Sequence, residues 1–314
     1  MMRRALVTGA TGFIASHLVD ALLSREHEVV GIDNLRTGKE SNLSSSLDND
    51  NFVFLQADVC DPDFEAMVGG NFDIVFHLAA ISSVKMSVER PHEVNRINVT
   101  GTINTLDAAC KLGAKRFVLT SSAAVYGDPK NQPVQEDEAL DPLSPYAASK
   151  VAAEMYCRAF KATHGLDYTI LRYFNVYGPR QAFSEYSGVI SIFINDALGN
   201  RPIEIEGDGK QTRSFVYVDD VVDCTILAGE RSKAAGEVIN VSGLDSASIT
   251  DLASMILTEV GTTESEALHV APRIGDVRES RGSMDKAKRM LGFTPQVSLS
   301  DGISRTVDWF RAVR

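Results

Sequence analysis

The sequence predicts an α/β protein in which a doubly wound parallel sheet is joined to a smaller C-terminal domain. Short apolar segments alternate with helical patterns through the first half of the chain, and a glycine-rich turn follows the first of these segments. The apolar segments contain few polar residues, as strands buried on both faces do. Strands and helices in regular alternation are typical of a parallel sheet covered by helices on both sides.

Each element of the first half follows from its own pattern of apolar residues. Ala5–Val7 is a compact apolar segment and predicts the first strand, and Phe13–Arg25 has apolar residues at helical spacing. The polar stretch Asn34–Asn51 predicts a loop. The remaining strands are expected at Glu28–Ile32, Phe52–Leu55, Asp73–His77, Arg116–Ser121 and Tyr168–Tyr173, and two long helices at Val94–Leu112 and Pro145–His164.

The regular alternation ends near Arg172, where we place a boundary between a first domain, residues 1–172, and a second, residues 173–314. Strands are still expected at Val216–Val222 and Glu237–Val241. These strands would return to the main sheet, so that the two domains are partly interleaved. The helices expected in the second domain are Gly188–Leu198, Asp285–Leu291 and Gly302–Val313.

Length and charge restrict the class of protein. The chain has 314 residues, which at about 150 residues per domain suggests two domains. Its 31 lysines and arginines are outnumbered by 42 aspartates and glutamates, giving a formal net charge of −11. Because a nucleic-acid surface needs an excess of basic residues, this balance argues against nucleic acid as a partner. No apolar run approaches the roughly 18 residues of a membrane span, so no membrane partner is expected.

The cysteines and histidines give no sign of a crosslinked or metal-binding protein. The four cysteines form no CxxC pair, and the six histidines form no HExxH cluster. Scattered cysteines fit reduced thiols in a cytosolic chain better than a disulfide framework. We therefore expect a cytoplasmic protein with no metal site.

The turn between the first strand and the first helix has the spacing GxxGxxA, with Gly9 and Gly12 as its glycines. Glycine lets the backbone approach a phosphate, and the helix N-terminus offers free N–H groups and the positive end of a dipole. A tight turn without any ligand is the alternative interpretation of an isolated motif. Asp33 favours a dinucleotide, because it ends the second strand about 20 residues later, where a carboxylate accepts hydrogen bonds from the adenosine ribose. These features predict a Rossmann-type sheet.

The charges near this turn bear on the choice of cofactor. Asp33 would repel a 2′-phosphate, which favours NAD over NADP, although Arg36 lies close and would partly offset that repulsion. Asp58 and Val59 follow the third strand, where a carboxylate suits an adenine contact. A solvent-facing loop carboxylate is the alternative interpretation of Asp58.

Three further residues are candidates for chemistry. Tyr146 and Lys150 stand at i and i+4 near the start of a helix and so share one face. A nearby ammonium stabilises phenolate and lowers a tyrosine pKa from about 10, which makes Tyr146 a candidate general acid/base. Ser122 follows the fifth strand at the carboxyl edge, where ligands of open α/β sheets bind. Taken singly, these motifs are also compatible with an exposed helical pair and a capping serine.

In combination and in order, these motifs resemble those of extended short-chain dehydrogenases/reductases, and among them nucleotide-sugar epimerases of the UDP-glucose 4-epimerase type. The resemblance covers nearly the whole chain. The segments that carry it are Thr8–Ala15, His77–Ala80, Asn98–Thr102, Thr120–Gly127, Tyr146–Lys150, Arg172–Arg180 and Arg273–Arg278.

The resemblance implies NAD as the cofactor, with Tyr146 as the base and Lys150 as its electrostatic partner and ribose ligand. The other residues that it places around NAD are Gly9, Gly12, Phe13 and Ile14 along the turn, Asp33 and Asn34 at the ribose, Asp58 and Val59 at the adenine, Leu78, Ala79 and Ala80 at the nicotinamide half, and Asn98 beneath it.

The resemblance also implies a nucleotide-sugar substrate, with Ser122 beside the sugar. The segment Pro202–Ile205 resembles one whose backbone meets uracil, so that UDP is an inference from the family. The residues placed around the substrate are Ser83, Ser122, Tyr146 and Val189, then Asn175, Arg213 and Arg273 at the diphosphate, Asp276 at the nucleoside ribose, and Ser280 at the edge of the sugar pocket.

The activity implied is 4-epimerisation of a UDP-hexose by transient oxidation, with NAD emerging unchanged. Related 4,6-dehydratases and uronate decarboxylases typically carry an acidic residue just after the serine or threonine of this strand, whereas this chain has Ala123 and Ala124. A uronate epimerase and a non-catalytic NAD sensor are further alternatives. The sensor is the less favoured, because such proteins usually lose the YxxxK motif or the serine, and both are present here.

Two positions bear on which sugar is used. Ser82 stands where some UDP-glucose 4-epimerases have a lysine. Ser280 is small, so it leaves volume for a 2-acetamido group that a tyrosine would crowd; packing against a loop is the alternative interpretation. We therefore expect N-acetylhexosamines to be accepted along with hexoses. The resemblance also implies a homodimer formed through Val94–Leu112 and Pro145–His164, although these helices could simply cover the sheet.

Overall fold

The centre of the molecule is one large sheet. The computed structural model describes residues 3–181, 188–262, 265–272 and 277–314. The large sheet contains β1 (Arg4–Thr8), β2 (Glu28–Asp33), β3 (Phe52–Gln56), β4 (Ile74–His77), β5 (Arg116–Ser122), β6 (Asp167–Tyr173) and β10 (Glu237–Val241). Their order is β10-β6-β5-β4-β1-β2-β3, and every neighbouring pair is parallel. This confirms the predicted doubly wound, Rossmann-type sheet.

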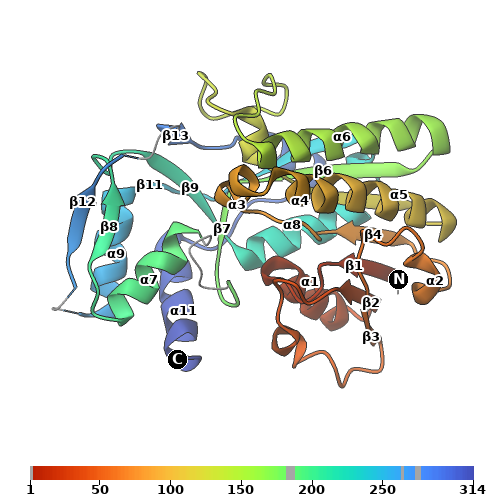
Figure 1. The fold of residues 1–314 in the computed structure, drawn as a ribbon, viewed down its shortest axis with the longest axis horizontal. Coiled ribbons are helices and arrows are strands. Elements are labelled where there is room, and N and C mark those ends of the chain that lie inside the picture. Colours follow the sequence, from red (N-terminus) through yellow and green to blue (C-terminus); the bar gives the residue numbers. More distant parts are fainter. Residues whose placement is uncertain (1–2, 182–187, 263–264, 273–276) are drawn as a thin grey trace.

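Helices cover both faces of the large sheet (Figure 1). In β1, Ala5 and Val7 pack in a buried cluster with Leu18, whereas Leu6 packs in a second cluster with Leu106. Because successive side chains of a strand point to opposite faces, a strand buried on both faces must be apolar throughout. One face carries α1 (Phe13–Ser24) and α8 (Val218–Glu230), and the other α3 (Val84–Glu89), α4 (Pro91–Asn95), α5 (Gly101–Lys111) and α6 (Pro145–His164).

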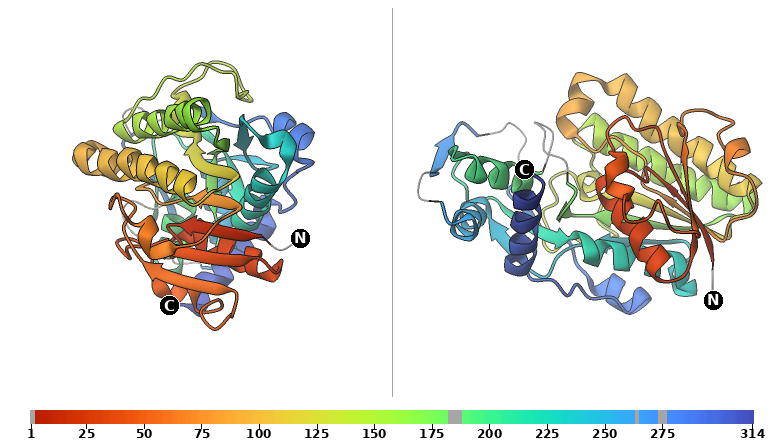
Figure 2. Two further views of the ribbon diagram at one scale, coloured as in Figure 1. Left: turned by 90° about the vertical axis from the view of Figure 1, so that its right-hand side faces the viewer. Right: turned by 90° about the horizontal axis from the view of Figure 1, so that it is seen from below.

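Two smaller sheets form the other end of the molecule, at the left of Figure 1. In the larger of them, β9 (Thr212–Tyr217) pairs with β7 (Asn175–Tyr177), β11 (Ser246–Ser248) and β13 (Glu279–Ser280). The second pairs β8 (Ile203–Glu206) with β12 (Ala267–Val270). Figure 2 shows this end opposite the N-terminal strands. Its helices are α7 (Val189–Leu198), α9 (Ile249–Val260) and α11 (Leu299–Ala312). The helices α2 (Glu65–Val68) and α10 (Asp285–Leu291) lie with the large sheet: Val68 packs in a cluster with Leu6 and Val75, and α10 contacts β10.

The expected strand Val216–Val222 is wrong in both extent and place. The strand β9 ends at Tyr217 and belongs to the smaller sheet, and α8 begins at Val218. Val218, Val221, Val222 and Thr225 are all buried. These residues are spaced as on one face of a helix, so helical packing outweighs the strand preference of valine. Residues 237–241 do return to the large sheet, as β10 beside β6.

The expected helix Val94–Leu112 is interrupted by a wider turn. Between α4 and α5, residues Arg96–Thr100 form one π-type turn, and Asn98 lies within it, buried. Such turns within α-helices are frequent at functional sites.

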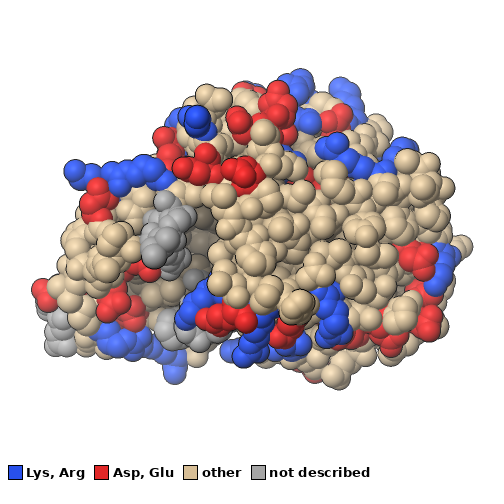
Figure 3. Space-filling view, turned by 45° about the horizontal axis from the view of Figure 1, so that its top comes forward, with Lys and Arg blue, Asp and Glu red and all other residues tan. Residues whose placement is uncertain are grey.

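The surface is mixed in charge. On the face drawn in Figure 3, basic and acidic residues are interspersed, and the surface is hollowed where the two ends of the molecule meet. No helix within the described ranges is both long enough and apolar enough to cross a bilayer.

Candidate active site

A pocket opens at the carboxyl ends of β1, β2, β3 and β4, beside the glycine turn. Nine of the residues expected to bind NAD line it together, namely Gly9, Gly12, Asp33, Asn34, Asp58, Val59, Leu78, Ala79 and Ala80. Phe13 and Ile14 begin α1 directly after Gly12. The pocket therefore gathers residues from four separate segments of the chain.

Steric contacts explain why the turn after β1 has glycine at position 9. Gly9 has a φ of +72°, and a Cβ at this position would lie 2.9 Å from the backbone of Ala79. Gly12 caps α1, and its N–H donates to the Gly9 carbonyl at 2.9 Å. The first N–H groups of a helix have no acceptor within the helix and suit a phosphate. Any side chain at Gly9 would therefore collide with the main chain of Ala79, so the turn can lie against this segment only with glycine there. The free N–H groups at the start of α1 are what suit a dinucleotide phosphate.

Two carboxylates at the pocket edge are fixed by local hydrogen bonds. Asp33 accepts from the Thr11 N–H at 3.1 Å and from the Leu35 N–H at 2.8 Å. Burial acts to raise the pKa of Asp58, but hydrogen bonds from the Cys60 N–H and from the Asn34 amide outweigh it and lower that pKa. Asp58 is therefore an ionised acceptor at neutral pH.

Ser122, Tyr146 and Lys150 come together at the carboxyl edge of β5. Ser122 is the last residue of β5, and Tyr146 and Lys150 lie in the first turns of α6. Ser144 caps this helix by accepting from the Ala147 N–H at 3.1 Å. Tyr146 and Lys150 are buried, Ser122 hydrogen-bonds to Tyr146, and the Lys150 ammonium donates to the Thr120 carbonyl at 2.9 Å.

The pKa of Tyr146 differs from the expectation. Burial raises it, and the hydrogen bond with Ser122 acts in the opposite direction without outweighing burial. Lys150 was expected to lower it, but its Nζ lies 6.0 Å from the centre of the Tyr146 ring and is engaged with Thr120. Burial also lowers the pKa of Lys150 to about 8, against the opposing charge of Glu154.

A buried hydrogen-bond chain behind the pocket was not foreseen from the sequence. Thr102 donates its hydroxyl proton to the Asn98 carbonyl at 2.6 Å, so it can only accept from Nε2 of His77, at 3.0 Å. The other nitrogen, Nδ1, then accepts from Thr8 at 2.8 Å, and Thr8 in turn accepts from the Ala79 N–H at 3.1 Å. Burial, with the charge of Lys150, lowers the pKa of His77 to about 3, so the ring is neutral.

The chain continues from Asn98 to the helix that carries Tyr146. The Asn98 amide donates to the Ser149 hydroxyl at 3.0 Å, and Ser149 donates to the Tyr146 carbonyl at 2.7 Å. Asn98 also exchanges hydrogen bonds with the backbone of Ile81. The glycine turn, the pocket wall and the start of α6 are therefore joined by one set of hydrogen bonds.

A buried ion pair supports the same edge of β5. Arg172 and Glu154 form two hydrogen bonds, of 2.8 and 3.0 Å, and both side chains are almost wholly buried. Ser121 donates to Glu154 at 2.6 Å, and Arg172 donates to the Tyr126 hydroxyl at 2.9 Å. The only sequence clue to this pair is that Glu154 lies four residues after Lys150, and so on the same face of α6.

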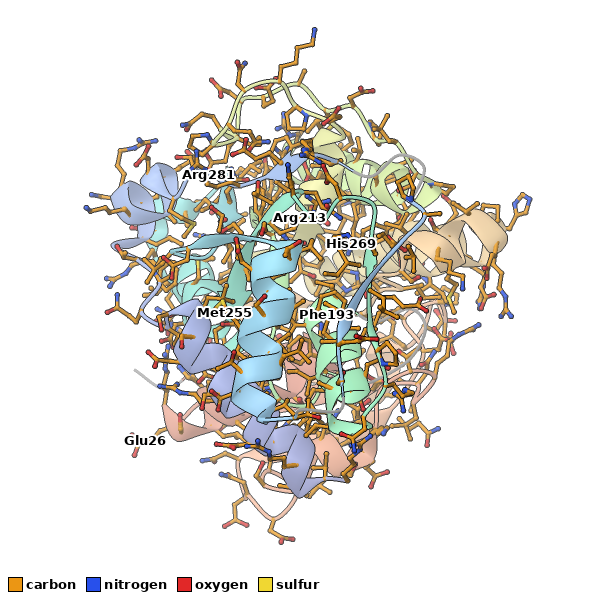
Figure 4. The ribbon with its side chains drawn as sticks, turned by 90° about the vertical axis from the view of Figure 1, so that its left-hand side faces the viewer. Glu26, Phe193, Arg213, Met255, His269 and Arg281 are labelled. Atoms are coloured by element: carbon orange, nitrogen blue, oxygen red, sulfur yellow. The ribbon has the colours of Figure 1, made fainter. Side chains whose placement is uncertain are left out.

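The expected substrate residues are more widely spread. Asn175 donates to the Ser214 carbonyl at 2.9 Å, and Arg213 lies on β9 in register with Ser280 of β13. Figure 4 labels Arg213 at the end that carries the smaller sheets. Ser83 caps α3, and Val189 is the first residue of α7. Arg273 and Asp276 lie outside the described residues. Over the described part of the chain, no group of three or more metal-ligating side chains occurs.

Comparison with known proteins agrees with this geometry. The model of the NAD dependent epimerase/dehydratase family matches residues 5–242. The chain is 42% identical over 310 residues to the UDP-glucose 4-epimerase of Mycolicibacterium smegmatis, with 98% of each chain covered.

Two solved structures are similar over nearly their full length. One is a UDP-N-acetylglucosamine 4-epimerase from Methanobrevibacter ruminantium in complex with UDP-N-acetylmuramic acid (TM-score 0.94, 36% identity, 100% and 99% of the two chains covered). The other is a UDP-glucuronic acid 4-epimerase from Bacillus cereus with UDP-glucuronic acid and NAD (TM-score 0.91, 35% identity, 99% and 100% covered). The chain therefore belongs to the NAD-dependent epimerase/dehydratase family, within the extended short-chain dehydrogenases/reductases, whose cofactor is NAD.

Proposed function

We propose that this protein is a nucleotide-sugar 4-epimerase that interconverts UDP-glucose and UDP-galactose, and also the corresponding N-acetylhexosamine pair. The observation that carries the proposal is the group formed by Ser122, Tyr146 and Lys150 at the carboxyl edge of β5. The strand β5 pairs with β4, whose carboxyl end leads into the wall of the dinucleotide pocket. The two residues after Ser122 are alanines, so no carboxylate follows it as in dehydratases and decarboxylases of the family. The similar proteins named above include 4-epimerases of UDP-glucose and UDP-N-acetylglucosamine.

In this mechanism Tyr146 moves the proton of the sugar 4-hydroxyl. Its phenolic oxygen takes that proton as the alcohol becomes a ketone, and later gives it back to O4. Ser122, which hydrogen-bonds to Tyr146, holds the phenolic oxygen of Tyr146 in place. The Lys150 ammonium, 6.0 Å from the centre of the Tyr146 ring, would favour the phenolate when it forms, although in this structure burial still raises the pKa of Tyr146. The chemistry that NAD supplies when bound is reversible hydride transfer at C4.

Inversion at C4 requires the keto sugar to turn while the rest of the substrate stays in place. Arg213 and Asn175, together with Arg273, would hold the diphosphate, and Asp276 the nucleoside ribose. Arginine suits this task because its planar guanidinium can bind two phosphate oxygens. Since Asn175 and Arg213 belong to the smaller end of the molecule, the substrate would lie across the hollow between the two ends.

We also infer that the protein is a homodimer that pairs through residues 94–112, which run from α4 through α5, and through α6. Met155 and Tyr156 on α6 are 41% and 39% exposed, although they are large and apolar. Exposed apolar residues grouped on one helix are typical of a contact surface. A second copy of the chain is the partner that the resemblance to other epimerases implies.

The test uses the purified protein incubated separately with UDP-glucose, UDP-N-acetylglucosamine and UDP-glucuronic acid, with products identified by proton NMR. We expect galacto-configured products from the first two sugars and no net NADH. Tyr146→Phe should lower the rate by about 10²–10⁴, while Tyr156→Phe, an exposed tyrosine on the same helix, should not. Turnover of the uronate alone would replace the proposal with a uronate epimerase. Loss of water or of carbon dioxide would assign a dehydratase or a decarboxylase, and no turnover of any sugar would favour an NAD sensor.

The same assay tests the sugar pocket. Ser280→Tyr should lower the rate with UDP-N-acetylglucosamine by about tenfold more than the rate with UDP-glucose, because the larger side chain would crowd the 2-acetamido group. Ser246→Tyr is the matched control, since Ser246 is exposed on β11, at the other side of β9. An equal loss with both sugars would overturn the volume argument.

A further inference from the structure

Two opposite charges line the cofactor pocket just beyond β2. Asp33 is the last residue of β2, Arg36 follows three residues later, and both line the pocket that contains the glycine turn. A carboxylate at this place repels a phosphate on the adenosine 2′-oxygen, whereas a guanidinium attracts one. Which nucleotide binds therefore depends on whether the charge of Arg36 is free to act on that oxygen.

The side chain of Arg36 is already paired. Its guanidinium forms an ion pair with the carboxylate of Glu93, which lies on α4, far away in the sequence. A second guanidinium, that of Arg90, lies 3.7 Å from the other oxygen of Glu93. The main chain at Arg36 is also fixed, because its N–H donates to the Asn34 side-chain oxygen at 3.0 Å. The side chain and the main chain of Arg36 are thus both held by other groups of the protein.

The carboxylate of Asp33, by contrast, still repels a phosphate on the adenosine 2′-oxygen. The groups that donate to its carboxylate are the backbone N–H groups of Thr11 and Leu35, which are neutral. Hydrogen bonds from neutral donors stabilise the ionised form without cancelling its charge. The balance of charge at the adenosine ribose is therefore set by Asp33, as long as Arg36 remains paired with Glu93.

We propose that Glu93 is a specificity-determining residue, which makes the enzyme select NAD over NADP by holding the Arg36 guanidinium. Glu93 acts through Arg36 and needs no contact of its own with the nucleotide. This inference concerns the cofactor and does not depend on which sugar is the substrate. Its failure would therefore leave the proposed epimerase activity intact.

A purely structural role for Glu93 predicts something different. Glu93 lies in the first turn of α4, where an acidic residue is favourable to the helix dipole. If that were its whole effect, removing its charge would change the stability of the protein and leave the choice of nucleotide unchanged. The relative amounts of NAD and NADP bound at equilibrium separate the two roles.

The experiment is a competition for the cofactor site. The protein is incubated with equal concentrations of isotopically labelled NAD and labelled NADP until the labelled nucleotide bound is constant. After free nucleotide is removed, the protein is denatured and the released labelled nucleotides are measured by mass spectrometry. Counting only the label restricts the result to sites that exchanged during the incubation.

Glu93→Gln should raise the ratio of bound NADP to bound NAD by about five- to tenfold, the effect of one freed guanidinium near a phosphate. The gain should shrink in high salt. Adding Arg36→Gln to that variant should return the ratio to the wild-type value. Glu89→Gln removes the same charge from the neighbouring helix α3 and should have no effect. An unchanged ratio in Glu93→Gln, an equal rise in Glu89→Gln, or a rise that survives in the double variant would overturn the proposal.

Discussion

At the scale of single residues, burial controls the ionisation of the central side chains more strongly than charge does. Tyr146 is almost wholly buried, and the sequence pattern, which places a lysine four residues later, gives no measure of that burial. The pKa of Lys150, lowered to about 8, lies close to neutral pH, and at pH 7 its ammonium donates to a backbone carbonyl. A small rise in pH therefore removes a charge at the centre of the site.

This property predicts how stability changes with pH. In the unfolded chain Lys150 has a pKa of about 10.4, whereas in the folded protein burial lowers it to about 8. Between these values the unfolded state binds more protons, so the free energy of unfolding should rise with pH relative to a Lys150→Met variant. The relative gain from pH 7.5 to pH 10 should be about 2 kcal/mol.

Urea unfolding of both proteins across this range measures the difference. Lys161→Met is the matched control, because Lys161 lies on the same helix and is exposed to solvent. The stability of the Lys161→Met variant should change with pH in the same way as that of the wild-type protein. If the stability of the Lys150→Met variant also changed with pH as the wild-type stability does, Lys150 would titrate in the folded protein as it does in water.

At the scale of elements, the hydrogen-bond chain through His77 joins pieces that the sheet alone would not align. It links β1 to β4, then passes through the π-type turn at Asn98 and reaches the first turns of α6. The wider turn matters here, because its residue Asn98 uses its carbonyl for Thr102 and its amide for Ile81 and Ser149. The pocket wall and Tyr146 are thereby held at a fixed separation.

Thr102→Val should therefore destabilise the protein by about 1–3 kcal/mol, because it leaves the Nε2–H of His77 buried without an acceptor. The substitution keeps the shape of the side chain, so little packing is lost. Thr100→Val, at an exposed position of the same segment, should cost no more than about 0.5 kcal/mol. Chemical denaturation measures the free energy of unfolding of the two variants. Equal losses in both would mean that the hydrogen-bond chain through His77 does not stabilise the protein.

At the scale of the whole molecule, we predict that the surface of α6 decides the oligomeric state. We expect the wild-type protein to be a dimer in solution, and a variant carrying both Met155→Asp and Tyr156→Asp to be a monomer, because paired carboxylates cannot be buried at an apolar contact. Light scattering coupled to gel filtration measures both. Leu268→Asp places a charge at an exposed apolar position on β12 and should leave the dimer intact. A wild-type monomer, or a dimeric double variant, would contradict the inferred contact.

The sequence was sufficient to predict those features that depend on residues close to one another along the chain. Helix Pro145–His164 has the predicted bounds, since its capping serine, early proline and apolar spacing all lie within a few residues of one another. The glycine turn and Tyr146 with Lys150 are likewise short-range patterns. The pairing of Arg36 with Glu93 and the ring orientation of His77 could not be predicted, because each depends on segments that only the folded sheet brings together. The predicted strand Val216–Val222 is wrong because valines favour strands, while the burial of these residues follows a helical period.

The path of the chain has a consequence for how new sugar specificities could arise. After β6 the chain leaves the large sheet for β7, β8 and β9, comes back through α8 and β10, leaves again for β11 and β12, and returns once more as α10 before ending in α11. Neither end of the molecule is a continuous segment that a single gene fusion or recombination event could replace. A change of substrate is therefore expected to proceed by individual substitutions at positions such as Ser280, with the cofactor half inherited unchanged.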